Sequence, residues 1–181
     1  MSPAAVETRI AFAAEHDTPT PYMQRTRDYY QALGFAPYRW AHFADVPFAP
    51  LRTPLARARV ALITTAAPFQ PGAGDQGPGA AYNAGAKFYK TFSVPTDAEP
   101  DLRISHVGYD RRHTSAEDIN TYFPLARLKE AAAARRIGAL GPRVHGAPTN
   151  RSHRATVETD AADLLARCQE DGVDAVVLAP T

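Results

Sequence analysis

Sulfur is scarce in this 181-residue sequence, which contains a single cysteine, Cys168. One cysteine excludes an internal disulfide framework and a zinc site built from four cysteines. The 20 lysine and arginine residues nearly balance the 19 acidic ones, so the net charge of +1 lacks the strong field that attracts nucleic acid or anionic membranes. No apolar run approaches the roughly 18 residues of a membrane span, and no signal-peptide pattern opens the chain. We therefore expect a cytoplasmic protein that binds neither nucleic acid nor membrane.

Proline, by contrast, is abundant, with 16 among 181 residues against a usual share of about 5%. Prolines interrupt residues 36–57, which predicts a loop-rich connection with at most a turn or two of helix near 51–58. Residues 70–85 (QPGAGDQGPGAAYNAG) are of low complexity, which predicts a flexible loop. They contain neither the dinucleotide-binding nor the P-loop spacing, so a nucleotide-binding loop is not expected here. The length favours a single domain over residues 1–181, at roughly 100–200 residues per domain.

Apolar periodicity and glycine stops predict the regular elements. Helices are expected over 21–33, from Phe123 to just before Gly138, and from Glu158 to just before Gly172. Short apolar runs predict strands at 59–65, 88–94, 102–105 and 173–178, whereas Val144 and His145 form too short a run to assign. This alternation predicts an α/β fold, namely a three-layer, Rossmann-like open sheet, mostly parallel, with helices on both faces and long Pro/Gly-rich loops.

The carboxyl ends of the strands are where open α/β sheets bind ligands. Thr64 and Thr65 end the first strand, where they either bind an anion through hydroxyl and backbone groups or simply terminate the strand. The last strand leads to Thr181 at the same edge. A buried strand is usually followed by a covering helix, so two interpretations stand open. Either the strand lies at the sheet edge or under an oligomer partner, or the native protein continues from this edge.

Further candidates follow the strand at 102–105. His106 is suited to protonating a leaving amine or holding a carboxylate, with Asp110 fixing its tautomer and Tyr109 beside it. The alternative is a hydrogen-bonded structural histidine and a turn-capping aspartate. Asp118 and Asn120 either cap the helix that begins at Phe123 or hold a substrate ammonium group.

Metal binding and thiol chemistry are not expected within this chain. The histidines match no standard zinc spacing, so we expect no metal site. Cys168 shares an apolar helix face with Leu164 and Leu165, which is typical of a buried, inert thiol.

Four motifs in the second half of the chain carry a resemblance. They are residues 104–110 (ISHVGYD), 118–120 (DIN), 123–128 (FPLARL) and 172–181 (GVDAVVLAPT). In this order they resemble the glycine/betaine/sarcosine/D-proline reductase family of selenoprotein B-type subunits. Residues 60–65 (VALITT) are similar to another element of that family, and the resemblance extends over residues 58–181.

The resemblance implies a reductase that cleaves the C–N bond of an amine or amino acid, with selenocysteine or cysteine as its nucleophile. In that family the nucleophile follows the strand that corresponds here to 173–178, so we expect it immediately after Thr181. This hypothesis treats the present chain as truncated and predicts that it has no reductase activity. The catalytic candidates are His106, Asp110 and Thr181, and the substrate-binding candidates are Thr64, Thr65, Tyr109 and Asn120.

The resemblance also implies partners, namely a subunit bearing a pyruvoyl group and a thioredoxin-like reductant, and we expect a homo-oligomer. Two other functions are weighed against it. An aspartate/glutamate racemase-like enzyme needs a second thiol directly after Thr65, where this chain has Ala66. A non-catalytic small-molecule-binding α/β domain predicts a closed sheet at Thr181 and no continuing reading frame.

Overall fold

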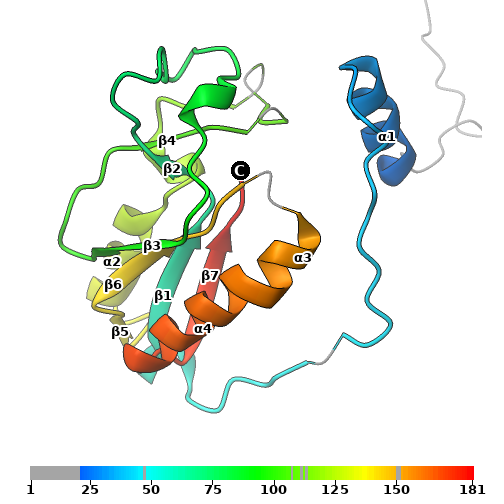
Figure 1. Cartoon of the computed structure of the whole chain (residues 1–181). Helices are drawn as coiled ribbons and strands as arrows, with labels where there is room; N and C mark the ends of the chain where they lie inside the picture. Colours follow the sequence, from blue (N-terminus) through cyan, green and yellow to red (C-terminus); the bar gives the residue numbers. More distant parts are fainter. Residues whose placement is uncertain (1–20, 47, 107, 111, 113, 150–151) are drawn as a thin grey trace, which may run out of the picture. The chain divides into compact units, whose positions relative to one another are not determined.

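The computed structural model describes residues 21–46, 48–106, 108–110, 112, 114–149 and 152–181. The chain forms two compact units, Met1–Val46 and Pro47–Thr181. The second unit contains the sheets and the candidate site (Figure 1).

The described part of the first unit is built around helix α1 (Tyr22–Ala32), which confirms the helix expected over 21–33. Its aromatic side chains contact the segment that follows the helix. The ring of Tyr22 lies 5.4 Å from that of Trp40, and Tyr30 lies 5.1 Å from Tyr38. The Trp40 indole also donates to the Met23 carbonyl at 3.4 Å. Helix α1 contains no buried residue, so aromatic contacts rather than a buried core hold this part of the unit together.

The second unit alternates short strands with helices and 3-10 turns. Its strands are β1 (Arg59–Thr64), β2 (Ala67–Pro68), β3 (Phe92–Pro95), β4 (Leu102–Arg103), β5 (Ala139–Leu140), β6 (Arg143–Gly146) and β7 (Ala175–Ala179). Its helical elements are η2 (Leu55–Arg57), η3 (Ala84–Ala86), η4 (Ile119–Thr121), α2 (Leu125–Ala133), α3 (His153–Ala155), the π-helical η5 (Thr156–Asp160) and α4 (Ala161–Glu170).

Strand β1 is the centre of the main sheet. On one side it pairs in parallel with β7, from Val60 opposite Ala175 to Thr64 opposite Ala179. On the other side it pairs in parallel with β5 and then β6, two short strands separated by Gly141 and Pro142. Strand β3 joins the far side of β6 in the antiparallel direction. The main sheet is therefore mixed.

The α/β class is confirmed, whereas the mostly parallel, three-layer Rossmann-like arrangement is not established. The strand expected at 88–94 is shorter and shifted, as β3, and it runs antiparallel to β6. The strand expected at 102–105 is reduced to β4, which pairs with β2 in a separate two-stranded sheet. Parallel neighbours need a crossover that is usually helical, and the helical elements among the described residues between β1 and α2 are short 3-10 turns, η3 and η4.

The core lies between β1 and α2. Val60 and Leu62 point to one face of β1, as alternate residues of a strand do. Leu62 packs with Phe123, Leu125 and Val144, and Val60 packs with Ala131 and Ile137. The prediction of a helix after Phe123 is confirmed, but its expected end just before Gly138 is wrong. Helix α2 ends at Ala133, because Arg135 takes a positive φ of 57° that no longer continues the helix.

The last helical stretch begins earlier than expected. Helix α3 starts at His153, where the Ser152 hydroxyl caps it by accepting from the Ala155 amide at 3.2 Å, and η5 leads into α4. Cys168 and Leu164 are buried on α4, and burial raises the pKa of the Cys168 thiol. The expectation of a buried thiol at this position is confirmed, whereas Leu165, expected on the same apolar face, is exposed.

Strand β6, which the sequence left unassigned, is tightly packed against β3. A Cβ atom added at Gly146 would lie 1.9 Å from Cε1 of Phe92, its cross-strand partner. Only glycine fits at this point of contact, so β6 depends on tertiary packing rather than on β-propensity.

Candidate functional site

The carboxyl ends of β1 and β7 lie side by side at one edge of the main sheet (Figure 1). The chain leaves β1, passes through α2 to β5 and β6 on one side, and then returns through α4 to β7 on the other side of β1. The connections thus change direction between β1 and β7. In open α/β sheets the crevice at such a point is the usual ligand site.

Thr65 and Thr181 bridge this point directly. The Thr181 amide donates to the Thr65 hydroxyl at 2.8 Å, and the two hydroxyl oxygens lie 3.1 Å apart. The Thr65 amide donates in turn to the Ala179 carbonyl at 3.3 Å. Three contacts therefore fix the end of β7 beside the end of β1, and both threonines remain partly exposed.

Thr64 has a different environment from its neighbour. It is fully buried, its hydroxyl donates to the Tyr122 carbonyl at 2.6 Å, and it accepts from the Ala66 amide at 3.1 Å. Both hydrogen-bonding roles of the hydroxyl are thus filled by backbone groups. This arrangement favours the strand-ending alternative for Thr64 and leaves Thr65 as the hydroxyl that faces the edge.

The connection from Ile104 to Tyr122 runs past the end of β1. Ile104 packs against the buried cluster that contains Ala66 and Tyr122, and Ala179 packs against the same cluster. Further along, the Tyr109 hydroxyl lies 3.1 Å from the hydroxyl of Thr121. Tyr109 is thereby hydrogen-bonded to Thr121, the residue before Tyr122. The carbonyl of Tyr122 in turn accepts the hydrogen bond from the Thr64 hydroxyl.

His106 follows Ile104 by two residues. Its Nδ1 accepts from the Gly108 amide at 3.1 Å, which places the ring proton of a neutral imidazole on Nε2. The Asp110 carboxylate accepts from the Arg112 amide at 3.1 Å, and its carbonyl accepts from Thr114. Asp110 thus closes a turn, and the backbone of Gly108 orients the imidazole.

Asp118 and Asn120 form a local cap. Oδ1 of Asp118 accepts from the Asn120 amide at 2.9 Å and from the Asn120 side chain at 2.8 Å, and these bonds lower the pKa of Asp118. The cap opens η4, the turn before α2. Among the described residues, Oδ1 of Asn120 is buried without a hydrogen-bond partner.

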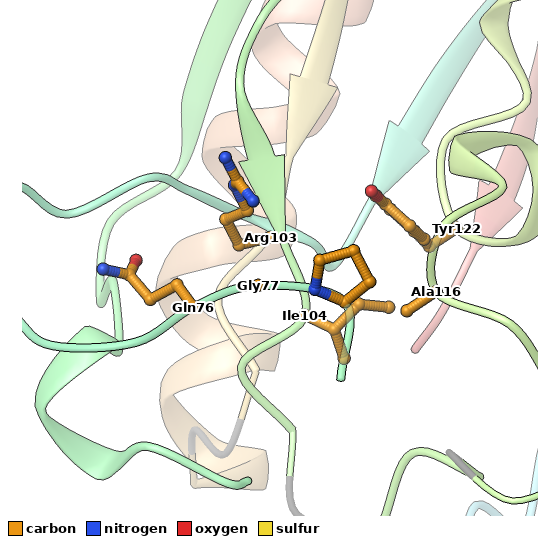
Figure 2. Close-up of a pocket in the computed structure, with 7 residues that line it drawn as sticks. Gln76, Gly77, Arg103, Ile104, Ala116 and Tyr122 are labelled. Carbon is orange, nitrogen blue, oxygen red and sulfur yellow. The ribbon is translucent and has the colours of Figure 1, made fainter. Parts of the chain in front are cut away.

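A small pocket opens next to these residues (Figure 2). Its walls come from residues 76–78, from Arg103 and Ile104, and from Ala116 and Tyr122. None of these side chains was predicted from the sequence as a site residue. A charged residue beside an apolar one in a short predicted strand, as Arg103 is, hints at a functional position. The sequence could not show that residues 76–78 lie next to it, because that contact forms only in the tertiary structure.

Within the described ranges, no three His, Cys, Asp or Glu side chains gather as metal ligands would. In the same part of the chain no helix has both the length and the apolar character needed to cross a bilayer.

Comparison with known proteins supplies the family. Neither the curated proteins nor the solved structures provide a match. The model of the family described as glycine/sarcosine/betaine reductase selenoprotein B matches residues 35–181, which include β1, β7 and the whole Ile104–Tyr122 connection. The match covers most of the chain and agrees with the resemblance carried by its motifs. The chain belongs to the glycine/sarcosine/betaine reductase selenoprotein B family.

Proposed function

We propose that this chain is the part of a selenocysteine- or cysteine-dependent reductase that cleaves a C–N bond at the edge between β1 and β7. The substrate is an amine or amino acid of the glycine, sarcosine, betaine or D-proline type. One observation carries the proposal: the Thr181 amide is held by the Thr65 hydroxyl at 2.8 Å, at the point where the connections of the sheet change direction.

The nucleophile is proposed to follow Thr181 in the full-length protein. The surroundings suit a selenolate or thiolate, because backbone amides and hydroxyls at a strand end stabilise an anion. When present, the selenolate would attack carbon, so that a C–Se bond forms as the C–N bond breaks with its electron pair going to nitrogen. A dithiol would then cleave the C–Se bond reductively: the carbon leaves with a proton as the reduced acid, the selenolate is restored, and the dithiol becomes a disulfide. The hydrogen bonds between Thr65 and Thr181 orient the end of β7 for that chemistry.

His106 is proposed as the acid that protonates the departing amine. The resting ring is neutral, because its Nδ1 accepts from the Gly108 amide and Nε2 carries the proton. To act as the acid, the ring takes up a second proton at Nδ1, which breaks the Gly108 bond, and the resulting imidazolium donates from Nε2. Tyr109 and Asn120 are proposed to contact the substrate, and Asp110 to keep the turn that presents the imidazole. A pyruvoyl-bearing partner subunit, a thioredoxin-like reductant, a homo-oligomeric state and a cytoplasmic location belong to the same proposal.

The test starts from the gene. We expect the reading frame to continue past codon 181 through a selenocysteine or cysteine codon, and a frame without either would overturn the position of the nucleophile. The protein produced from that frame should release ammonia or an amine from glycine, sarcosine or betaine, or open the ring of D-proline, with a dithiol reductant, whereas residues 1–181 alone should not. Steady turnover by residues 1–181 alone would refute the mechanism.

A variant pair tests the acid. His106→Gln should lower kcat by about 100-fold or more, the usual contribution of a general acid. His153→Gln, an exposed histidine at the start of α3, is the matched control and should leave kcat unchanged. Equal rates for the His106→Gln variant and the unaltered enzyme would remove His106 from the mechanism.

A further inference from the structure

Strand β7 is the outermost strand on its side of the main sheet (Figure 1). Among the residues that the structure describes, β7 pairs with β1 and with no other strand. Its sequence, AVVLA, contains no charge and no proline. Edge strands usually carry such residues, because an unprotected edge offers its backbone groups to another strand. The outer edge of β7 therefore has the composition of a paired strand.

The side chains of β7 are much more exposed than those of its neighbour. Val176, Val177 and Leu178 are 39%, 37% and 68% exposed, whereas Leu62 of β1 is completely buried. Residues opposite each other in paired strands face the same side of the sheet. Val177 therefore lies on the α2 side with Leu62, and Leu178 lies on the α4 side. Both faces of the sheet are incompletely covered at β7.

Helix α4 extends the apolar surface past this strand. Asp163 accepts from the Thr91 hydroxyl, and Arg167 donates to the Ser93 hydroxyl at 2.7 Å, so this side of α4 is turned toward β3. At about 3.6 residues per turn, Leu165 lies on the opposite side of the helix, toward the outer edge of β7. Leu165 is 59% exposed. The apolar face of α4 is therefore wider than the sheet that it covers.

The side of α4 around Leu165 is uncharged in the middle and charged at its ends. Its exposed residues are Ala161, Ala162, Leu165 and Gln169. Glu158, seven residues before Leu165, has a side chain that is 59% exposed. Gly172, seven residues after Leu165, lies beside the Arg59 guanidinium, which donates from Nη1 to the Asp171 carbonyl at 2.8 Å. An acidic and a basic group thus flank Leu165.

We infer that a second copy of this chain binds here across a two-fold axis, through a dimer surface formed by the outer edge of β7 and the side of α4 around Leu165. The two β7 strands pair antiparallel, so the two main sheets become one continuous sheet with both α4 helices on the same face. A two-fold interface needs a self-complementary surface, and a free strand edge provides one. The inference rests on the proposed function in one respect, because it assigns a surface to the homo-oligomer proposed there.

The charges agree with a second copy as the occupant. Antiparallel α4 helices place the end with Glu158 in one copy against the end with Arg59 in the other, and the two-fold axis creates this pair of opposite charges twice. The net charge of +1 per chain causes little repulsion between copies. A strongly charged partner, by contrast, finds no matching charge at the centre of the dimer surface.

Sedimentation velocity of the purified chain at micromolar concentrations tests the dimer. We expect a reversible dimer with twice the chain mass of 19.6 kDa. A monomer at every concentration would overturn the inference. Larger oligomers would also overturn it, because a two-fold interface occupies the outer edge of β7 in a single pair.

Two leucine variants test which surface forms the dimer. Leu165→Glu and Leu178→Glu introduce charges at its centre, and each should weaken dimerisation by about tenfold or more. Leu55→Glu, at a leucine of η2 that is 50% exposed, is the matched control and should leave dimerisation unchanged. Thermal unfolding verifies that each variant is folded. Unchanged dimerisation in both test variants would overturn the assignment of the surface.

A charge exchange tests the antiparallel arrangement. Glu158→Arg and Arg59→Glu should each weaken dimerisation, and the double variant should recover most of the loss, because the opposite charges meet again. Glu130→Arg, which breaks an exposed ion pair with Arg127 on α2, is the matched control and should have no effect. If the double variant dimerises more weakly than either single variant, the antiparallel arrangement is wrong.

The full-length protein separates this inference from the proposed function. We expect it to be a dimer that the Leu165→Glu substitution weakens. A monomeric full-length protein that cleaves the C–N bond would refute only the dimer surface. A dimeric full-length protein that cleaves no C–N bond would refute only the proposed reaction.

Discussion

In the second unit, the region between α4 and the main sheet uses polar groups differently from the carboxyl edge of β1 and β7. On the side of α4, ionic side chains connect the helix to the strands. Arg143 on β6 bonds to the Asp171 carboxylate at 3.0 Å, and Arg167 on α4 donates to the Ser93 hydroxyl of β3 at 2.7 Å. His145 is completely buried between them, with Nδ1 2.8 Å from the Ser93 hydroxyl and Nε2 3.5 Å from Asp171.

At the carboxyl edge of β1 and β7 the polar contacts are fewer and neutral. Thr65 and Thr181 meet through hydroxyl and amide groups, and both are partly exposed. Ionic contacts therefore hold α4 rigidly against the strands. The edge is held by partly exposed neutral contacts, which a ligand or a neighbouring residue can replace at little cost in free energy. Functional groups are commonly placed on such loosely held segments above a rigid frame.

The largest effect is expected where the frame is most tightly packed. Gly146→Ala would place a Cβ atom 1.9 Å from the Phe92 ring, and overpacking of this kind lowers the free energy of unfolding by about 3 kcal/mol. Urea unfolding measures the loss. In a Phe92→Ala background the same substitution should cost little, because the ring that it meets is gone. An equal loss in both backgrounds would contradict the packing account.

Asp171→Ala tests the ionic side of the comparison. The Asp171 carboxylate is buried and accepts from Arg143, so its removal leaves donors unpaired at a cost of about 2 kcal/mol. A lower urea midpoint with an unchanged slope would verify this. Asp101→Ala, which removes an exposed carboxylate from an ion pair elsewhere, is the control and should change the midpoint much less.

The two threonines at the end of β1 give a smaller and more selective contrast. Thr64→Val should cost about 1.5 kcal/mol, because it leaves the buried Tyr122 carbonyl and Ala66 amide unsatisfied. Thr65→Val should cost about 0.5 kcal/mol, because its partners at the edge reach water. If the proposed function holds, Thr65→Val should nevertheless lower kcat more than Thr64→Val in a protein that carries the proposed nucleophile, because Thr65 orients the end of β7. Urea unfolding and amine release measure the two effects.

The smallest effect concerns pH. Burial lowers the pKa of His145, and Arg143 and Arg167 lower it further, against the opposing charges of Asp171 and Asp163. The unfolded chain therefore takes up a proton below the ordinary value of 6.5 that the folded chain does not, so stability falls as the pH falls below 6.5.

His145→Gln should flatten the dependence of unfolding free energy on pH between 6.5 and 5. His42→Gln, at an exposed position of the other unit, is its control and should leave the slope as it is. An unchanged slope in His145→Gln would show that other groups cause the loss of stability.

Local sequence patterns predicted those helices and strands whose formation depends on their own residues. The apolar run of β1 and the proline-started helices α1 and α2 were predicted, because burial of one face and helix initiation are local properties. The end of α2 was not: the helix stops at Ala133, and Arg135 takes the positive φ that was expected of Gly138. Strand β6 was missed because its four residues have little β-propensity of their own. It forms because Gly146 accommodates Phe92 and because Ile63 and Thr64 supply the pairing edge.

The candidate site divides in the same way. The sequence placed Thr65 and Thr181 at strand ends, and the structure brings them to 2.8 Å. Thr64, the identical residue one position earlier, was an equal candidate, yet it is buried under Tyr122. The pocket lined by Arg103 and Tyr122 was not predicted, because its walls come from three segments of the chain that share no sequence pattern.

The sequence by itself determined the α/β class, the positions of the main helices and of β1 and β7, and the motifs that identify the family. Only the tertiary structure decided the mixed direction of the sheet, which threonine faces the edge, and the formation of the pocket. The physical reason is the range of the interactions. Periodicity, caps and motifs act between residues close in the chain, whereas the Thr65–Thr181 contact joins residues 116 positions apart and exists only once the sheet has formed.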